Sequence, residues 1–141
     1  MSINIKSIIT SGLISGVIIS ISAISMVPVV GNEMDDVLAS RGLPPLSSLS
    51  MGFFCFVSIV YGIFLIFLYS LIKTHIKSKM KTALISSLVV WFVAYFISNA
   101  SLVAYGFMPV KLTVIGTVWG LGELLLAGIV GSRLYKEVKQ K

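Results

Sequence analysis

Long apolar stretches alternate with short polar connections along the whole chain. Four of these stretches are long enough to cross a bilayer, whose hydrocarbon core of about 30 Å needs about 20 apolar helical residues. They run from Ile8 to Val30, Met51 to Ile72, Ala83 to Val103, and Leu112 to Leu134. The pattern therefore predicts an all-α protein, a transmembrane four-helix antiparallel bundle that forms a single integral membrane domain over residues 1–141.

The composition agrees with a membrane protein. Of the 141 residues, 57% are hydrophobic and 11% are charged, and the mean hydropathy is +1.03, values far from those of an ordinary soluble domain. The first apolar stretch follows Lys6 and contains the small residues Ala23 and Ser25 around Ile24, so a cleaved signal peptide is an alternative for it. Its apolar run is longer than the usual signal segment of about 7 to 15 residues, and we interpret it as a retained span.

Lysine and arginine residues gather on one side of the predicted spans. Nine lie at the N-terminus, between the second and third spans, or after the fourth span: Lys6, Lys73, Lys77, Lys79, Lys81, Arg133, Lys136, Lys139 and Lys141. The other two connections contain Arg41 and Lys111. Because cytoplasmic segments keep positive charge, this bias predicts a multi-pass membrane protein with both termini in the cytoplasm. The topology accounts for the net charge of +6 without nucleic acid, and it leaves membrane lipids as expected partners.

Residues 31–50 form the one sizeable connection, and they are expected on the outer side. Asn32 can cap a short extracytoplasmic helix, and Gly42 with Pro44-Pro45 would end it before a serine between residues 47 and 50 caps the second span. The first turn of this helix would contain the carboxylates Glu33, Asp35 and Asp36, which the helix N-terminus favours. A divalent-cation site is the alternative, but such sites need about six fixed oxygens, so we predict no metal site.

Small residues predict which helix faces pack together, because membrane helices associate through close packing and hydrogen bonds. In the fourth span, a rotation of about 100° per residue places a carboxylate, Glu123, within one stripe of small residues. A similar stripe occurs in the first span. The predicted helix-packing seam consists of Gly12, Gly16, Gly116, Gly120, Ala127 and Gly131. Glu123 is therefore expected to face other helices and not lipid.

Glu123 lies near the middle of the fourth span. Tyr61 is the expected hydrogen-bond partner, because the second and fourth spans run in the same direction and the two residues fall at similar depth. Three serines at nearby levels would complete this intramembrane polar centre: Ser20, Ser58 and Ser98. A neutral acid is expected, since the chain has no lysine or arginine near midplane. Asn99, on the Phe92 and Tyr95 face of the third span, either bonds locally to backbone or lipid head groups, which we prefer, or contacts another protein.

Signals of enzymatic chemistry are missing from the sequence. It contains no nucleotide-binding loop, no cluster of histidines with carboxylates and no nucleophile motif, so we predict neither catalysis nor a cofactor. Cys55 is expected to be a small apolar residue and His75 a solvated residue of the cytoplasmic rim. An enzyme acting on lipid or quinone would have to use the acidic residues between positions 31 and 50.

Three motifs in order carry a likeness to known sequences. They are Gly42 to Pro45 after the first span, Leu68 to Lys73 at the end of the second, and a last span reading W-G-x-x-E, then a small residue, then G-x-x-L-Y. The last motif comprises Trp119, Gly120, Glu123, Ala127, Gly131, Leu134 and Tyr135. With them the chain resembles, over most of its length, an uncharacterised family of small bacterial four-span integral membrane proteins. The resemblance implies the fold and a shared carboxylate, and it brings no assigned activity.

Two functions fit such a chain. The first is a small non-catalytic membrane protein, an accessory or assembly subunit of a larger membrane complex, whose partners are other integral membrane subunits or a second copy of itself. The alternative is a small proton- or cation-coupled transporter that uses Glu123, because ionisable residues inside a membrane are functional by default. The short connections and the absence of catalytic motifs favour the subunit.

Overall fold

The computed structural model describes residues 3–137, in which the regular secondary structure is helical and no strand occurs. The helices are α1 (Ile5–Ala39), α2 (Ser48–Lys73), α3 (Lys79–Trp91), the π-helical segment η1 (Phe92–Ile97), α4 (Ser98–Ala104) and α5 (Val110–Leu134). Because α3, η1 and α4 follow one another without a break, they form a single helix over Lys79–Ala104. The described chain thus has four long helices, each long and apolar enough to cross a membrane, and the predicted four-helix bundle is confirmed.

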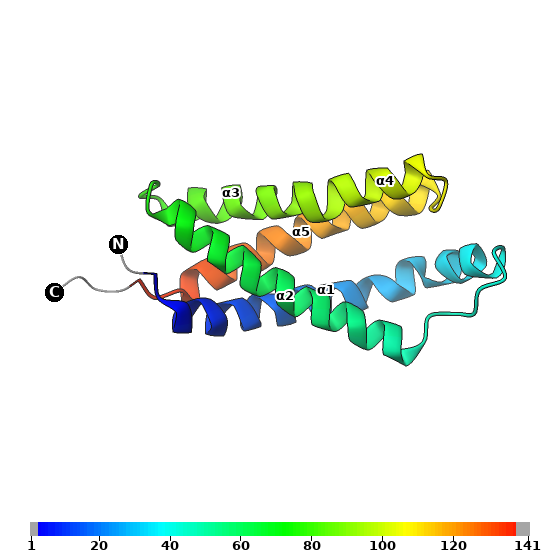
Figure 1. Cartoon of the computed structure of the whole chain (residues 1–141), viewed down its shortest axis with the longest axis horizontal. Coiled ribbons are helices and arrows are strands. Elements are labelled where there is room, and N and C mark those ends of the chain that lie inside the picture. The colour runs from blue at the N-terminus through cyan, green and yellow to red at the C-terminus, as the bar shows by residue number, and fades with distance from the viewer. Residues whose placement is uncertain (1–2, 138–141) are drawn as a thin grey trace.

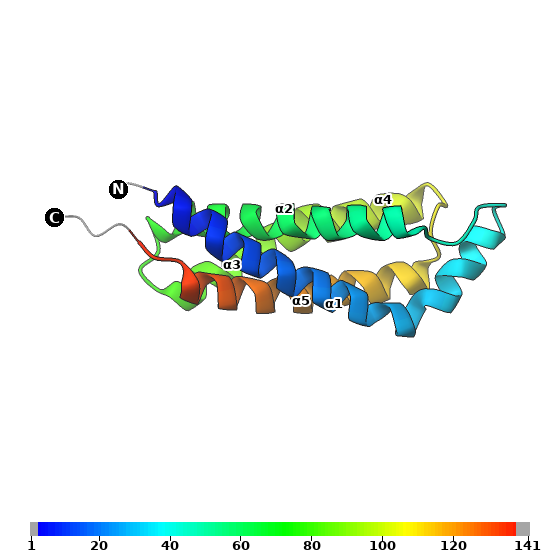
Figure 2. The same ribbon diagram turned by 90° about the horizontal axis from the view of Figure 1, so that it is seen from below.

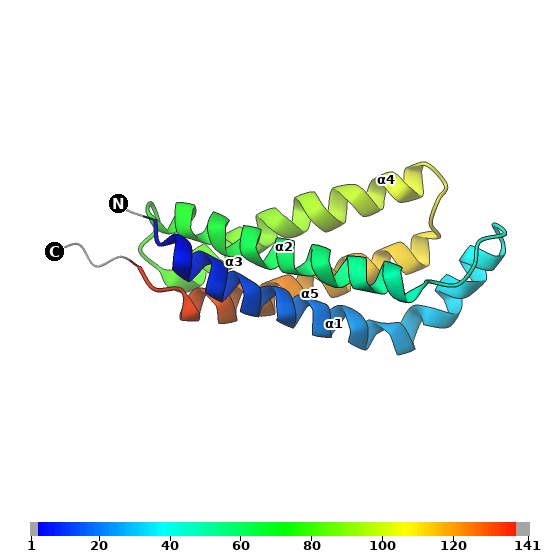
Figure 3. The same cartoon turned by 60° about the horizontal axis from the view of Figure 1, so that its bottom comes forward.

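The helices form a closed ring in which sequence neighbours are antiparallel. α1 contacts α2, α2 contacts α3, α3 contacts α5, and α5 returns to α1. The start of α1, the α2–α3 turn and the end of α5 all lie at one end of the bundle (Figure 1). α2 and the α3–α4 helix diverge from the turn that connects them, so the bundle is wider at its other end (Figures 1 and 3).

The core is built from all four helices. One buried cluster contains Ile19 of α1, Leu65 of α2, Val90 of α3, and Leu124 and Ala127 of α5. A second cluster lies nearer to the ends of the chain and contains Ile8, Ile66, Tyr69, Ala83 and Tyr135. Large apolar side chains outside these clusters are exposed on the helix surfaces, as expected for a chain whose outer surface meets lipid and not water.

α1 differs from the prediction at its outer end. The helix continues past Val30 to Ala39, and Asn32 lies inside it. The prediction of a separate short helix capped by Asn32 is therefore wrong. Pro28 also lies inside α1; a proline removes one backbone hydrogen bond and bends a helix. Figure 2 shows the resulting change of direction before the cyan end of α1. The bend lets one helix serve both as a span and as the outer segment that was predicted separately.

The turn after α1 follows its predicted signals. Gly42 has a φ of 68°, a left-handed conformation that glycine adopts without strain, and α1 ends before it. Ser47 then caps α2, its side chain accepting a hydrogen bond from the backbone N–H of Ser50. The predicted end of the outer segment and the serine cap are confirmed.

Two contacts fix the outer end of α1 to the α4–α5 turn. Glu33 forms an ion pair with Lys111, and the Arg41 guanidinium donates a hydrogen bond of 3.0 Å to the carbonyl of Gly106. Asp35 and Asp36 remain exposed. Among residues 3–137, no three histidine, cysteine, aspartate or glutamate residues are placed to hold a metal ion together. Glu33 therefore serves as a link between helix ends.

Glycine residues allow α1 and α2 to approach backbone to backbone. A Cβ built on Gly12 would lie 2.6 Å from the Cα of Ile63, and one on Gly16 would lie 3.0 Å from the carbonyl oxygen of Ser58. A Cβ on Gly62 would overlap the backbone of both Gly12 and Gly16. Gly12 and Gly16 thus lie on the surface of α1 that packs against α2, and Gly62 is their counterpart in α2.

Three of the four seam positions predicted in α5 are buried in the bundle. Gly120, Ala127 and Gly131 are buried; a Cβ on Gly131 would lie 2.5 Å from the Cδ1 atom of Ile66. Gly116 is only partly buried, and no described atom lies within 4 Å of the position its Cβ would take. Gly116 therefore does not belong to the contact surface, since at this level of α5 the third helix contacts Thr117, to which Trp91 and Asn99 donate hydrogen bonds.

Candidate functional site

Glu123 of α5 is the acid at the centre of the candidate site. Its side chain is 5% exposed, and its Oε1 atom accepts a hydrogen bond from the hydroxyl of Tyr95 in η1. Tyr61 was the predicted partner, and that prediction is wrong. The ring of Tyr61 packs against the ring of Tyr95 with 6.3 Å between centroids, so Tyr61 is a neighbour of the donor and not the donor itself.

The π-helical segment η1 explains why Tyr95 takes this role. In an ideal α-helix, each step of four residues advances about 40° around the axis, so a row of residues spaced by four winds away from its partner helix. A π-helical turn contains an extra residue and rotates the following residues back. Tyr95 and Asn99, in and after η1, are thereby kept on the face where Ser87 and Trp91 lie before it, and all four residues hydrogen-bond to α5.

These bonds join the middle of the third helix, from Ser87 to Asn99, to the middle of α5. The Ser87 hydroxyl donates to the carbonyl of Leu124 at 2.9 Å, and the Trp91 indole donates to the carbonyl of Thr117 at 2.8 Å. The Asn99 amide donates to the Thr117 hydroxyl, also at 2.8 Å. The preferred explanation of Asn99, a local bond to backbone or lipid head groups, does not match this contact. Its partner is a side chain of α5, which the sequence did not identify.

The three predicted serines do not gather around Glu123. The Ser20 hydroxyl lies 3.5 Å from the carbonyl of Cys55, where it links α1 to α2. Ser58 bonds within its own helix, to the carbonyl of Phe54 at 2.9 Å. Ser98 is exposed, because the π-helical turn rotates it away from the bundle, and its predicted place in the polar centre is wrong.

Ser22 of α1 is the polar neighbour that sequence reasoning missed. Its hydroxyl lies beside the carboxyl group of Glu123, and it accepts a hydrogen bond of 3.1 Å from the indole of Trp119. A signal was present, since Ser22 is a polar residue inside an apolar span at the depth of the tryptophan in the W-G-x-x-E motif. The structural polar centre therefore consists of Glu123, Tyr95, Ser22 and Trp119.

A groove lies over this polar centre on the outer surface of the bundle, between α1 and α5. Its volume is about 610 Å³. It is lined by Ser22, Val114, Ile115, Val118, Trp119, Gly122, Glu123 and Leu126, and this set defines what we call the α1–α5 groove. Within residues 3–137, no side chain or backbone group hydrogen-bonds to the buried Oε2 atom of Glu123. The site thus offers an apolar groove next to a carboxyl oxygen that has no hydrogen-bond partner in the described chain.

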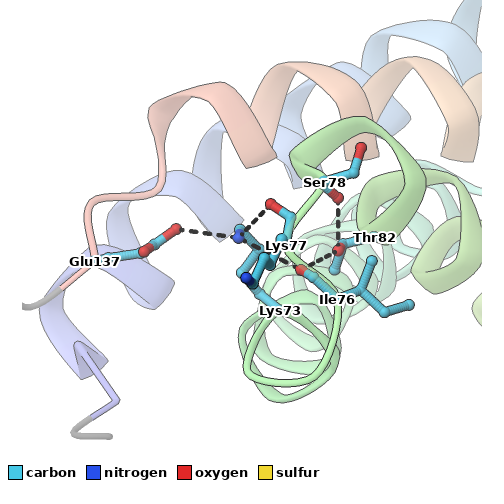
Figure 4. Close-up of polar contacts among 6 residues, drawn as sticks. All are labelled: Lys73, Ile76, Lys77, Ser78, Thr82 and Glu137. Carbon is cyan, nitrogen blue, oxygen red and sulfur yellow. Dashed lines mark hydrogen bonds and ion pairs between the residues drawn. The ribbon is translucent and has the colours of Figure 1, made fainter.

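At the basic end of the bundle, Lys73 makes polar contacts that connect neighbouring segments. Lys73, whose side chain is 12% exposed, donates a hydrogen bond of 2.8 Å to the carbonyl of Lys77 and lies 3.8 Å from the carboxylate of Glu137. Figure 4 shows these contacts beside Thr82, which bonds to the carbonyls of Ile76 and Ser78. One of the predicted basic residues therefore closes the α2–α3 turn and joins it to the segment after α5.

The fold defines a multi-pass α-helical integral membrane protein. Comparison of the chain with known protein families, with curated proteins and with solved structures found no match.

Proposed function

We propose that the protein is a non-catalytic accessory or assembly subunit of a larger integral membrane complex. The α1–α5 groove is the observation that carries this proposal. Ionisable groups inside a membrane face a bundle interior or a cavity and pair with other polar groups, yet Oε2 of Glu123 has no partner among the described residues. Lipid chains offer no hydrogen bonds, whereas a protein partner seated in the groove can supply one.

Contacts between helices elsewhere in the bundle support the role of a scaffold for this protein. The Ser15 hydroxyl donates to the carbonyl of Ala127 at 3.0 Å and thereby joins α1 to α5, in addition to the bonds between the third helix and α5. Gly62 brings the backbones of α1 and α2 into direct contact. Backbone approach and interhelical hydrogen bonds are the main forces that hold membrane helices together, and a tightly held bundle suits a subunit that presents a surface.

Purification in mild detergent from the native membrane tests the proposal. We expect the wild-type protein to elute as part of a stoichiometric complex much larger than its own mass of 15.2 kDa. Gly122→Leu, which fills the α1–α5 groove, should release it from that complex. Gly52→Leu is the matched control, because both glycines have open space where a Cβ would be added. A wild-type protein that elutes alone, as monomer or homodimer, would contradict the subunit function.

A second candidate function is a small proton- or cation-coupled transporter. It is favoured by the carboxyl group of Glu123, which has one oxygen held by Tyr95 and the other free beside the groove. For this function, the purified protein in vesicles should carry protons to an entrapped pH-sensitive dye, and Glu123→Gln should abolish the flux. Proton flux by an isolated homodimer would favour the transporter over the subunit.

We also propose a bacterial inner membrane location with both termini in the cytoplasm. The start of α1, the α2–α3 turn and the end of α5 share one end of the bundle (Figure 1). The sequence assigns most of its lysine and arginine residues to these same segments, and cytoplasmic segments carry the positive charge. The resemblance to small bacterial four-span proteins supports the same membrane.

Thiol labelling tests this orientation. In a Cys55→Ser background, which has no other cysteine, single cysteines are introduced as Leu43→Cys before α2 and His75→Cys in the α2–α3 turn, both exposed positions. A membrane-impermeant maleimide added to intact cells should label the first variant only, and permeabilised cells should show both. Labelling of the His75→Cys variant in intact cells would invert the proposed topology.

A further inference from the structure

The α1–α5 groove is elongated in the direction of the helices. Its lining residues on α5 extend from Val114 to Leu126, which corresponds to about 18 Å at a rise of about 1.5 Å per residue. That is more than half of a hydrocarbon core of about 30 Å. An occupant that follows the groove therefore lies roughly parallel to α1 and α5.

The groove also defines the chemistry of its occupant. Apart from Ser22, Trp119 and Glu123, the side chains that line it are apolar. Oε2 of Glu123 is buried and without a hydrogen-bond partner in the described chain, and the lysine and arginine residues of the sequence lie outside the middle of the spans. A hydrogen-bond donor or a positive charge from another molecule would complement this oxygen, in addition to the Ser22 hydroxyl that lies beside the carboxyl group.

Gly122 makes close approach possible at this depth. It lines the groove next to Glu123, and no described atom lies within 4 Å of the position that its Cβ would occupy. Small residues beside a polar group are the arrangement through which membrane helices approach and bond to one another. The two features together favour a helix over a lipid chain, because a lipid chain fills apolar space and leaves the carboxyl oxygen unsatisfied.

We propose that the α1–α5 groove binds one transmembrane helix of a partner protein, packed against Gly122, with a lysine, arginine or side-chain amide directed at Glu123. The inference rests on the proposed subunit function and names the chemistry of the partner. Binding then satisfies Oε2 and excludes lipid from the groove. Because the donor is needed at one depth, the contact also fixes the register of the partner helix along the membrane normal.

A pair of model peptides tests the charge requirement. Two dansyl-labelled leucine- and alanine-rich helices of about 23 residues, one with a central lysine and one with leucine there, are titrated into phosphatidylcholine–phosphatidylglycerol vesicles that contain the purified protein. Energy transfer from Trp119 and Trp91 to dansyl reports association. The lysine peptide should bind at least about threefold more tightly, the lower end for an interhelical polar contact. Glu123→Gln should remove this preference, and Glu33→Gln, at the outer end, should keep it.

A second pair of variants locates the peptide. Gly122→Leu should weaken binding of the lysine peptide at least about tenfold, because the added side chain takes up space that the bound peptide helix would fill. Gly52→Leu should bind the peptide as the wild type does. Unchanged far-UV circular dichroism of both variants shows that they fold. Equal binding of the two peptides, or wild-type binding by Gly122→Leu, overturns the proposal.

Other occupants give distinct results. Binding of a lipophilic quaternary ammonium ion without peptide preference identifies a small-molecule site, and a protein dimer that dissociates with Gly122→Leu identifies a second copy; either result contradicts a partner helix. The experiments also distinguish failure of the inference from failure of the proposed function. If the peptide binds but no native complex is found, only the subunit function is contradicted. If a native complex persists with Gly122→Leu, the protein is a subunit but the groove is not its docking site.

Discussion

Gly62→Leu is expected to destabilise the protein by about 3 kcal/mol or more, near the upper end for overpacking of a well-filled contact. A Cβ at this position overlaps the backbone of Gly12 and Gly16, and backbone atoms cannot turn aside as a flexible side chain can. α1 and α2 must therefore separate, and the helix contact built on their close approach is lost. The free energy of unfolding, measured by circular dichroism during denaturation of the detergent-solubilised protein, gives the effect.

Gly52→Leu is the control for this substitution. It makes the same chemical change on the same helix, at a position where the added Cβ meets no described atom within 4 Å. We expect a change within about 0.5 kcal/mol, typical of an exposed position away from special contacts. Equal destabilisation by the two variants would show that loss of a helical glycine, and not the α1–α2 contact, decides the outcome.

The bundle could be predicted from sequence because each of its determinants is local. Hydropathy alone identifies segments that must be helical to cross a membrane, and small residues spaced by four mark the faces that approach, as at Gly12 and Gly16. The outer end of α1 shows where local signals fail. Asn32 and the acids after it form a good helix start, but Pro28 bends the existing helix without ending it, and the ion pair between Glu33 and Lys111 fixes the extension.

The site was predicted only in part, for a reason of geometry. Burial of Glu123 followed from its place in a stripe of small residues. Its partner did not, because the choice between Tyr61 and Tyr95 depends on the rotation of the third helix around its axis. Segment η1 has neither proline nor glycine to indicate a π-helical turn, and a rotation by one residue moves Ser98 outwards and Tyr95 inwards. Ser22 was missed for a related reason, since it faces α5 only in the assembled bundle.

Tyr95→Phe should have the second large effect, because it removes the Tyr95 hydroxyl that, within residues 3–137, donates a hydrogen bond to the carboxyl group of Glu123. A buried polar group without its partner costs about 1–3 kcal/mol, and the ring of Phe preserves the packing of Tyr95 against Gly120. The same bond is visible spectroscopically. At neutral pH the wild-type protein should show the infrared C=O band of a protonated carboxyl group, absent in Glu123→Gln, and Tyr95→Phe should shift this band to higher frequency as the bond to oxygen is lost.

Tyr61→Phe is the control for Tyr95→Phe. It removes a phenol hydroxyl in the same region without removing the hydrogen bond to Glu123. Tyr61 touches the ring of Tyr95 but is not the donor to Glu123, so this variant should leave the carboxyl band in place. The double variant Tyr95→Phe/Glu123→Gln should be less destabilised than the sum of its single changes, because the two residues share one bond. A carboxylate band without a protonated one in the wild type would mean that Glu123 is ionised, and the partner in the groove would then have to bring a full positive charge.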